Sequence, residues 1–163
     1  MRAGRPRSEP SIGKTVKLFQ IEEPGGSSVD PDAPGVAIGI DISGAEAEVA
    51  VAVGGNAAVL ADREGFALDV AVPPPGAPAE RWQLLFEGAR LRAERALAQP
   101  VTHAVVAVAS APDAAFAALL STAGSAAELT LLRIVAREAL GAGSPALAAA
   151  ILAEDLAPRP GAP

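Results

Sequence analysis

Cysteine and tyrosine are absent from the 163-residue chain, and histidine occurs once, as His103. Without cysteine the chain can form no disulfide framework, no thiolate zinc site and no thiol nucleophile. A single histidine excludes most histidine-based metal sites and leaves none to spare for a Ser-His-Asp triad. Aromatic residues are also few, and these are Trp82, Phe19, Phe66, Phe86 and Phe116. The composition therefore excludes disulfide-stabilised scaffolds, enzymes that use a thiol, and most zinc enzymes.

Charge is distributed unevenly along the chain. Residues 1–17 carry five basic residues against Glu9, a net charge of +4, and the remaining residues carry eight arginines and 18 acids, a net charge of −10. The two lysines are Lys14 and Lys17, so none follows position 17. The isoelectric point of about 4.8 argues against a general nucleic-acid-binding protein. The basic tail alone would bind an acidic partner weakly and in a salt-sensitive way.

Hydrophobic runs are too short for a membrane-spanning helix, which needs about 18 consecutive apolar residues. The basic N-terminus is followed by no apolar signal-peptide segment, since Leu18 and Phe19 are closed off by Gln20. We therefore expect a cytoplasmic protein with no membrane partner.

Composition predicts three segments. Residues 1–34 are rich in Pro, Gly, Ser and charge and predict a flexible basic tail and linker. Within it, the extended stretch Thr15–Ile21 could dock as a strand or bind a partner. Residues 8–15 end in Gly-Lys-Thr like a P-loop, but Ser8 replaces the first glycine and no apolar strand precedes it. Residues 35–157 predict one α/β domain, and residues 158–163 a disordered end.

Hydrophobic periodicity predicts the order of the elements within that domain. The expected strands cover residues 35–41, 46–53, 57–61, 101–109 and 128–135. The first expected helix begins at Pro78, with Trp82 and Phe86 as core anchors. The second begins in a capping box at residues 110–113 and ends at Gly124 as its C-cap. A short helix ends at Gly141, and Ser144-Pro145 starts the last helix, which covers residues 146–156. The order β-β-β-α-β-α-β-α predicts a ribonuclease H-like mixed sheet of three antiparallel strands followed by parallel strands, with helices on the faces.

Three ordered stretches carry a family resemblance. Val36–Val51 reads VAIGIDISGAEAEVAV, Pro100–Ala109 reads PVTHAVVAVA, and Leu132–Val135 reads LRIV. Together they resemble, in reduced form, the first lobe of the actin-like ATPase domain in the 70-kDa heat-shock chaperone family, over about 120 residues. The resemblance implies Mg-ATP or Mg-ADP contacts at Asp41, Ser43 and Gly44.

The departures from the family pattern argue against hydrolysis. Ala45 stands where the family has a hydroxyl near the phosphates, and the domain contains no lysine to match the catalytic one. Arg63 is an imperfect substitute, because a planar guanidinium does not replace a compact ammonium. Glu138 is a candidate for a displaced acid, and the motifs of the second lobe are missing. Phosphoryl transfer needs charge stabilisation from several directions, so we expect no efficient ATP hydrolysis by this chain alone.

Other chemistries fit the residues less well. A nuclease would need several carboxylates around one or two metal ions. Asp41 and either Glu87 or Glu94 could supply two of them, but strand 101–109 ends without the further acid that such a site requires. Glu46 and Glu48 share one strand face and are typical of a solvated surface. His103 lies in mid-strand with no partner evident from the sequence.

Two hypotheses about function follow. The first is a non-hydrolysing protein-interaction or regulatory module that needs no cofactor and uses a protein partner or a homodimer. Its expected contact is the alanine-rich helix Ala146 to Leu156, where Ala148, Ala149, Ile151 and Leu152 leave little charge to face water. The second is an ATP-binding half that completes its nucleotide site by pairing with another chain.

Overall fold

The computed structural model of the chain describes residues 35–61, 70–74 and 76–158. The tail at 1–34, the P-loop-like residues 8–15, Arg63 and the end at 159–163 lie outside the described residues. The strands are β1 (Val36–Asp41), β2 (Glu48–Val53), β3 (Asn56–Leu60), β4 (Val101–Val108) and β5 (Thr130–Ala136). The helices are α1 (Ala79–Leu97), α2 (Ala114–Ala126), the 3₁₀ turn η2 (Arg137–Leu140) and α3 (Pro145–Leu156).

The five strands form one mixed sheet in the order β3-β2-β1-β4-β5. β1 pairs antiparallel with β2, and β2 pairs antiparallel with β3 through the Gly54-Gly55 turn. β4 and β5 are added parallel to β1, through crossovers that contain α1 and α2. The predicted α/β class and the ribonuclease H-like arrangement are therefore confirmed.

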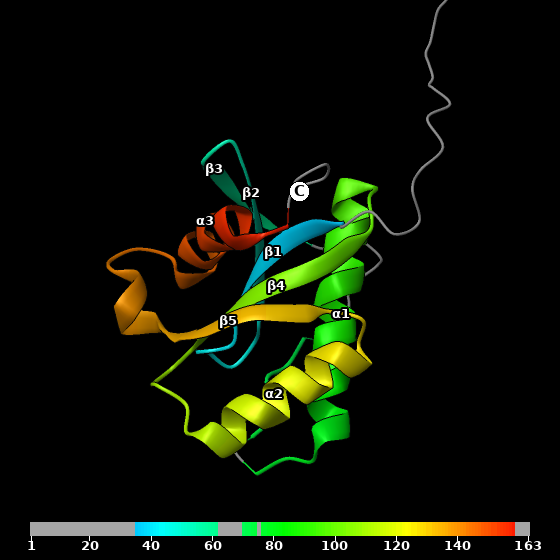
Figure 1. Ribbon diagram of the computed structural model, residues 1–163, viewed down its shortest axis with the longest axis vertical. Helices are drawn as coiled ribbons and strands as arrows, with labels where there is room; N and C mark the ends of the chain where they lie inside the picture. Colours follow the sequence, from blue (N-terminus) through cyan, green and yellow to red (C-terminus); the bar gives the residue numbers. More distant parts are fainter. Residues whose placement is uncertain (1–34, 62–69, 75, 159–163) are drawn as a thin grey trace, which may run out of the picture. The chain divides into compact units, whose positions relative to one another are not determined.

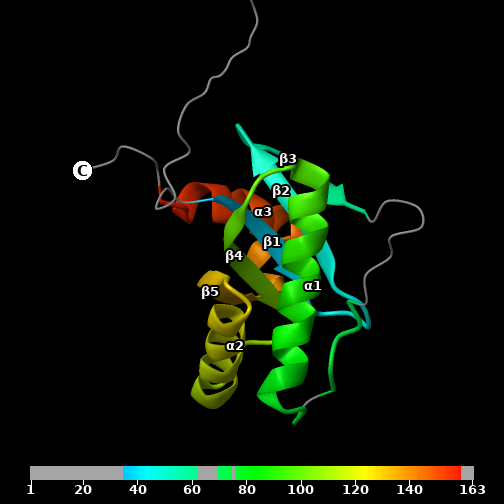
Figure 2. The same cartoon turned by 90° about the vertical axis from the view of Figure 1, so that its right-hand side faces the viewer.

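Helices cover both faces of the sheet. Figure 1 shows the sheet between α1 and α3, and Figure 2 shows α1 and α2 side by side. Because side chains alternate along a strand, β1 divides its residues between the two faces. Ile38 and Ile40 join the large core under α1 and α2, whereas Ala37 lies in the smaller core under α3.

Helix α1 follows the predicted apolar stripe. Its N-cap is Pro78, and Trp82 and Phe86 are 3% and 0% exposed, so both predicted core anchors are confirmed. Trp82 packs edge-on against Phe116 of α2, with ring centroids 5.4 Å apart. The apolar stripe expected in the core also includes Ala96, which is exposed in the last turn of the helix.

Both ends of α2 differ from the prediction. The N-cap is Asp113, whose Oδ1 accepts a hydrogen bond of 2.8 Å from the Phe116 amide, so the capping box expected at Ser110 is wrong. Gly124, predicted as a C-cap, lies inside the helix. A Cβ there would approach Leu131 Cγ to 2.9 Å, so the glycine permits close packing of α2 on β5. Glu128 then takes a positive φ of 66°, and β5 starts later than expected.

Helix α3 packs its small residues directly on the sheet. Ser144 caps it as predicted, with Oγ accepting from the Leu147 amide at 3.3 Å. Ala146, Ala149, Ala150 and Ala153 are fully buried on this face. The expectation that Ala149 contacts a partner is therefore wrong, because it lies against β1 and β4 in the smaller core. Ile151 remains exposed on the outer side of the helix.

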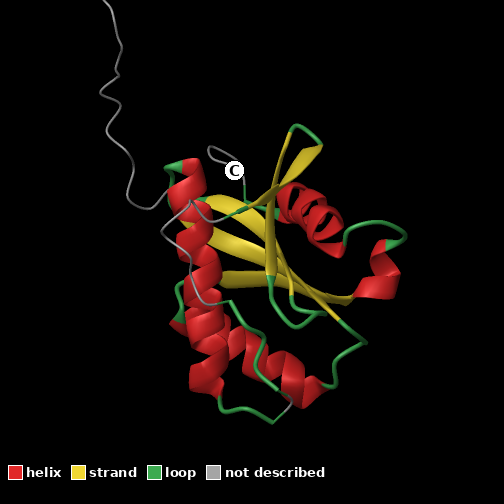
Figure 3. Ribbon diagram, turned by 180° about the vertical axis from the view of Figure 1, so that it is seen from behind, coloured by secondary structure: helices red, strands yellow, loops and turns green. Residues whose placement is uncertain are grey.

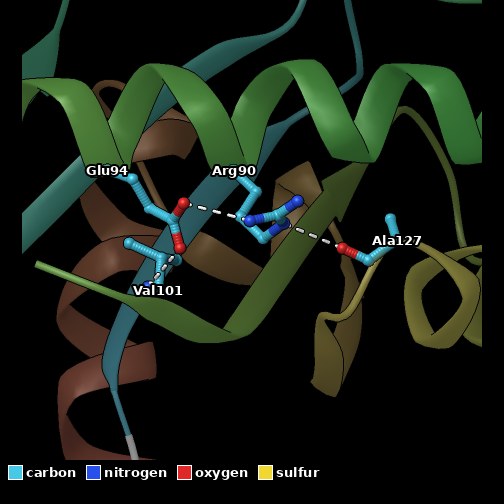
Figure 4. Close-up of polar contacts among 4 residues, drawn as sticks. All are labelled: Arg90, Glu94, Val101 and Ala127. Atoms are coloured by element: carbon cyan, nitrogen blue, oxygen red, sulfur yellow. Dashed lines mark hydrogen bonds and ion pairs between the residues drawn. The ribbon is translucent and has the colours of Figure 1, made fainter.

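Two polar clamps join elements that are distant in sequence. Arg90 forms an ion pair of 3.0 Å with Glu94 and donates a hydrogen bond of 2.9 Å from Nε to the Ala127 carbonyl (Figure 4). Glu94 Oε2 also accepts from the Val101 amide at 2.9 Å, so the pair holds the start of β4 beside the α2–β5 connection. Glu154 of α3 accepts from both amides of the β2–β3 turn, at 2.6 and 2.9 Å.

Candidate functional site

Asp41 ends β1 at the carboxyl edge of the sheet. Its Cα is paired with Glu48 of β2 on one side and with Ala107 of β4 on the other. Oδ1 accepts two hydrogen bonds from Ser43, one of 2.9 Å from the amide and one of 2.6 Å from the hydroxyl. Such a turn satisfies Oδ1 locally. The structure therefore brings Asp41 and Ser43 together, with the serine hydroxyl donating to the carboxylate.

The loop after β1 is tied to the segment before α1. The Ala47 amide donates to the Val70 carbonyl at 2.8 Å, and the Val72 amide donates to the Ala45 carbonyl at 2.9 Å. Gly44 lies exposed within this loop, and a Cβ placed on it would meet only the Glu46 carbonyl oxygen, at 3.9 Å. Gly44 therefore stands beside Asp41 and Ser43 in sequence, but no close approach requires a glycine there.

A hollow of about 490 Å³ opens beside the same end of the sheet. Its walls come from the ends of β1 and β4, the segment before α1, and the first turns of α1 and α2, and they include Ile42, Val72, Trp82, Val108, Asp113 and Phe116. Side chains alternate along the strand, so Ile42 lies on the opposite face of the sheet from Asp41. Its face is the one under α1, on which Ile38 and Ile40 also lie. Asp41 is accordingly not among the lining residues. Sequence reasoning assigned Trp82 to the core and gave no sign of this hollow.

Glu48 is the carboxylate directly paired with Asp41, across β1 and β2, whereas Glu87 and Glu94 do not join them. Glu94 is engaged at the opposite, amino-terminal end of β4, where it accepts from the Val101 amide. Glu87 accepts a hydrogen bond of 3.0 Å from Gln83 Nε2, one turn earlier on α1. Glu46 and Glu48 are exposed, as predicted. Within the described residues, no group of three or more acidic or histidine side chains could hold a metal ion.

Glu138 lies in η2, directly after β5, and is exposed. Because β5 runs parallel to β4 and β1, Glu138 is at the same sheet edge as Asp41, with β4 between their strands. β4 itself ends without an acid, at Ala109 and Ser110. The edge thus presents the paired carboxylates Asp41 and Glu48, with Glu138 separated from them by β4.

His103 has a partner that the sequence did not reveal. Its Nδ1 lies 2.7 Å from Thr102 Oγ1, and the same hydroxyl oxygen accepts a hydrogen bond of 2.8 Å from the Gly35 amide. Burial lowers the pKa of His103 below its ordinary value of 6.5, because desolvation disfavours the imidazolium. The residue lies near the start of β4, away from Asp41, and so belongs to the packing of the amino-terminal edge.

Comparison with known proteins assigns no family to the chain. No protein-family model matches it, and no curated protein matches it. In the part of the chain that the structure describes, no helix is long and apolar enough to cross a membrane.

Proposed function

We propose that this chain is a reduced relative of the first ATPase lobe of the 70-kDa heat-shock chaperones, and that it acts as a non-hydrolysing protein-interaction or regulatory module. Support for the relationship comes from the three sequence stretches and from the sheet order β3-β2-β1-β4-β5 that contains them. We infer a cytoplasmic location from the sequence.

One observation carries the proposal: Asp41 is held by its own loop. Within the described residues, both hydrogen bonds to its carboxylate come from Ser43, whose hydroxyl is thereby directed at Oδ1. No described cation forms an ion pair with Asp41, and the chain has no lysine beyond position 17. Charge stabilisation from several directions, which phosphoryl transfer requires, is not assembled among the described residues.

The alternative is an ATP-binding half-site completed by another chain, and one feature favours it. Asp41 Oδ2 receives no hydrogen bond within the described residues, and the carboxylate is only partly buried. That oxygen could therefore face a magnesium-bound water if a second chain supplied phosphate-binding groups. Asp41, Ser43 and Gly44 would then make the contacts that the resemblance implies.

Isothermal titration of the full chain with Mg-ATP and Mg-ADP separates the two functions. The interaction-module proposal predicts no binding heat with either nucleotide. The half-site alternative predicts measurable binding that is lost in Asp41→Ala, because the carboxylate that organises the metal is removed.

Glu46→Gln is the matched control for Asp41→Ala. It removes an exposed carboxylate from the same loop and leaves the Asp41–Ser43 turn intact. Micromolar binding that disappears in Asp41→Ala and persists in Glu46→Gln would overturn the interaction-module proposal.

A further inference from the structure

Exposed apolar side chains concentrate at one corner of the domain. Among the described residues, the large hydrophobic side chains with high exposure are Val53, Val59, Leu84 and Ile151. Val53 ends β2, and Val59 lies in β3. Ile151 belongs to the turn of α3 that precedes Glu154, and Glu154 binds the β2–β3 turn. Three of the four therefore surround the β2–β3 hairpin, whereas Leu84 lies apart on α1.

Val59 and Ile151 belong to the same face of the sheet. Val59 is directly opposite Ala50, and Ala50 is buried in the alanine cluster beneath α3. Ile151 lies one helical turn from Leu147, which packs against that cluster together with Ala57 of β3. The exposed fractions of Val59 and Ile151 are 45% and 39%, so an apolar strip runs along the β3 side of α3. Figure 3 shows the hairpin beside α3 at this corner.

The two edge strands of the sheet, β5 and β3, differ in charge. β5, at one edge, carries the exposed Arg133 in its middle. β3, at the other edge, reads Asn-Ala-Ala-Val-Leu and has neither charge nor proline. Monomeric proteins protect edge strands with charges, prolines or bulges, because a bare edge pairs with other strands. Among the described residues, β3 has no charge, proline or bulge at this edge.

β3 is complementary to a second copy of itself. An antiparallel pair centred on Ala58 would place Ala57 opposite Val59 of the second copy, and Asn56 opposite Leu60. Directly opposite residues share a face, so Val59 would stay on the α3 side in both copies. The pairing brings no charged residue of β3 against another, although the chain as a whole carries a net charge of −6.

We propose that two copies of this chain associate through β3 and form one continuous ten-stranded sheet. The inference rests on the proposed function, since it names the partner of the interaction module. Five residues of strand span only about 17 Å, and a stable interface needs about 800 Å² from each partner. The Val59 and Ile151 strip must therefore contribute to the contact. The contact surface is the outer, β3 side of α3 together with the β3 edge.

Sedimentation equilibrium of the full chain tests the dimer. The expected mass rises with concentration toward twice the monomer mass of 16.2 kDa. Val59→Lys places charge on the apolar strip of both copies and should weaken association at least about tenfold. Ile151→Gln should weaken the association of the two copies as well. Because Ile151 is exposed on α3, this variant should fold even if Val59→Lys does not, and it then provides the test.

Thr130→Lys is the matched control, because it adds the same charge to an exposed position on the opposite edge strand. It should leave the dimer mass unchanged. A second readout is hydrogen exchange, in which the β3 amides that do not pair with β2 should become protected as the concentration rises.

A wild-type mass that stays at 16.2 kDa across the concentration range would overturn the dimer. A dimer disrupted by Thr130→Lys and unaffected by both Val59→Lys and Ile151→Gln would overturn it too. Either result leaves the nucleotide titration unaffected, so failure of the dimer is distinguishable from failure of the proposed function.

Discussion

Replacing Gly39 by alanine tests whether the glycine of the β1 motif serves helix packing. A Cβ on Gly39 would lie 2.3 Å from the Ala150 nitrogen and 2.6 Å from the Ala146 carbonyl oxygen. Both atoms belong to the backbone of α3, so no side-chain rotation relieves the contact. The whole helix would have to move away from β1 and lose its close fit to the sheet.

Gly39→Ala should lower the free energy of unfolding by about 2 kcal/mol. Overpacking of a tight core costs about 1–3 kcal/mol, and backbone contacts this close place Gly39 at the upper end. Part of this overpacking cost is offset, because replacing a glycine within a strand by alanine removes a cost of about 0.5–1 kcal/mol in conformational entropy. The net loss is a large fraction of the stability of about 5–15 kcal/mol that is usual for a domain.

Urea denaturation followed by circular dichroism and by the fluorescence of Trp82, the single tryptophan, measures this change. Gly44→Ala is the matched control, because its Cβ meets nothing closer than 3.9 Å, and it should change stability by less than about 0.5 kcal/mol. Equal stabilities of Gly39→Ala and wild type would refute the packing explanation.

Two further predictions concern polar contacts, and a third concerns the burial of His103. Glu154→Ala removes both hydrogen bonds to the β2–β3 turn and should cost about 1–2 kcal/mol in urea denaturation. Glu94→Ala leaves the Val101 amide and the Arg90 guanidinium without their acceptor and should cost about 2 kcal/mol in the same assay. Burial lowers the folded-state pKa of His103, so below pH 6.5 the unfolded chain binds the proton more readily, and stability should fall as pH falls through this range. His103→Asn should reduce that dependence.

Each of these predictions has its own control. Asp155→Ala removes the neighbouring exposed carboxylate on α3 and should be nearly neutral, so equal losses for Glu154→Ala and Asp155→Ala would contradict the role of the turn contact. For Glu94, Glu94→Gln keeps an acceptor for Val101 and should recover part of the loss. An identical pH dependence in His103→Asn and wild type would contradict the role given to desolvation of His103.

Strong local patterns made most of the fold predictable from sequence. The buried apolar run of β4, the Gly54-Gly55 turn and the stripe through Trp82 each identify an element type without tertiary information. Their order, with right-handed crossovers between parallel strands, leaves few topologies. The arrangement of three antiparallel strands followed by parallel strands was therefore predictable from the sequence.

The sequence-based predictions were wrong or incomplete where a residue contacts an element that is distant in the sequence. Gly124 resembled a helix end, yet its lack of a side chain accommodates Leu131 of β5. Ala149 resembled part of an open contact surface, but small residues on α3 let the helix approach the β1 backbone. The bond from Glu154 to the turn joins residues about 100 positions apart, which no local pattern indicates.

The candidate site was predictable only in part. The position of Asp41 at the end of β1 follows from the strand pattern and is confirmed. The donation from the Ser43 hydroxyl to Asp41 depends on the conformation of one short loop, which the sequence did not specify. The hollow beside Trp82 depends on how α1 and α2 meet the sheet edge, and this is a property of the packing alone.

The most direct test of the central claim is the calorimetric titration of the folded full chain with Mg-ATP at concentrations up to the millimolar range. The account predicts no binding heat, because the Asp41 carboxylate is held by Ser43 and no lysine lies in the domain. Saturable binding that is lost in Asp41→Ala would contradict the account and establish the chain as a nucleotide-binding half.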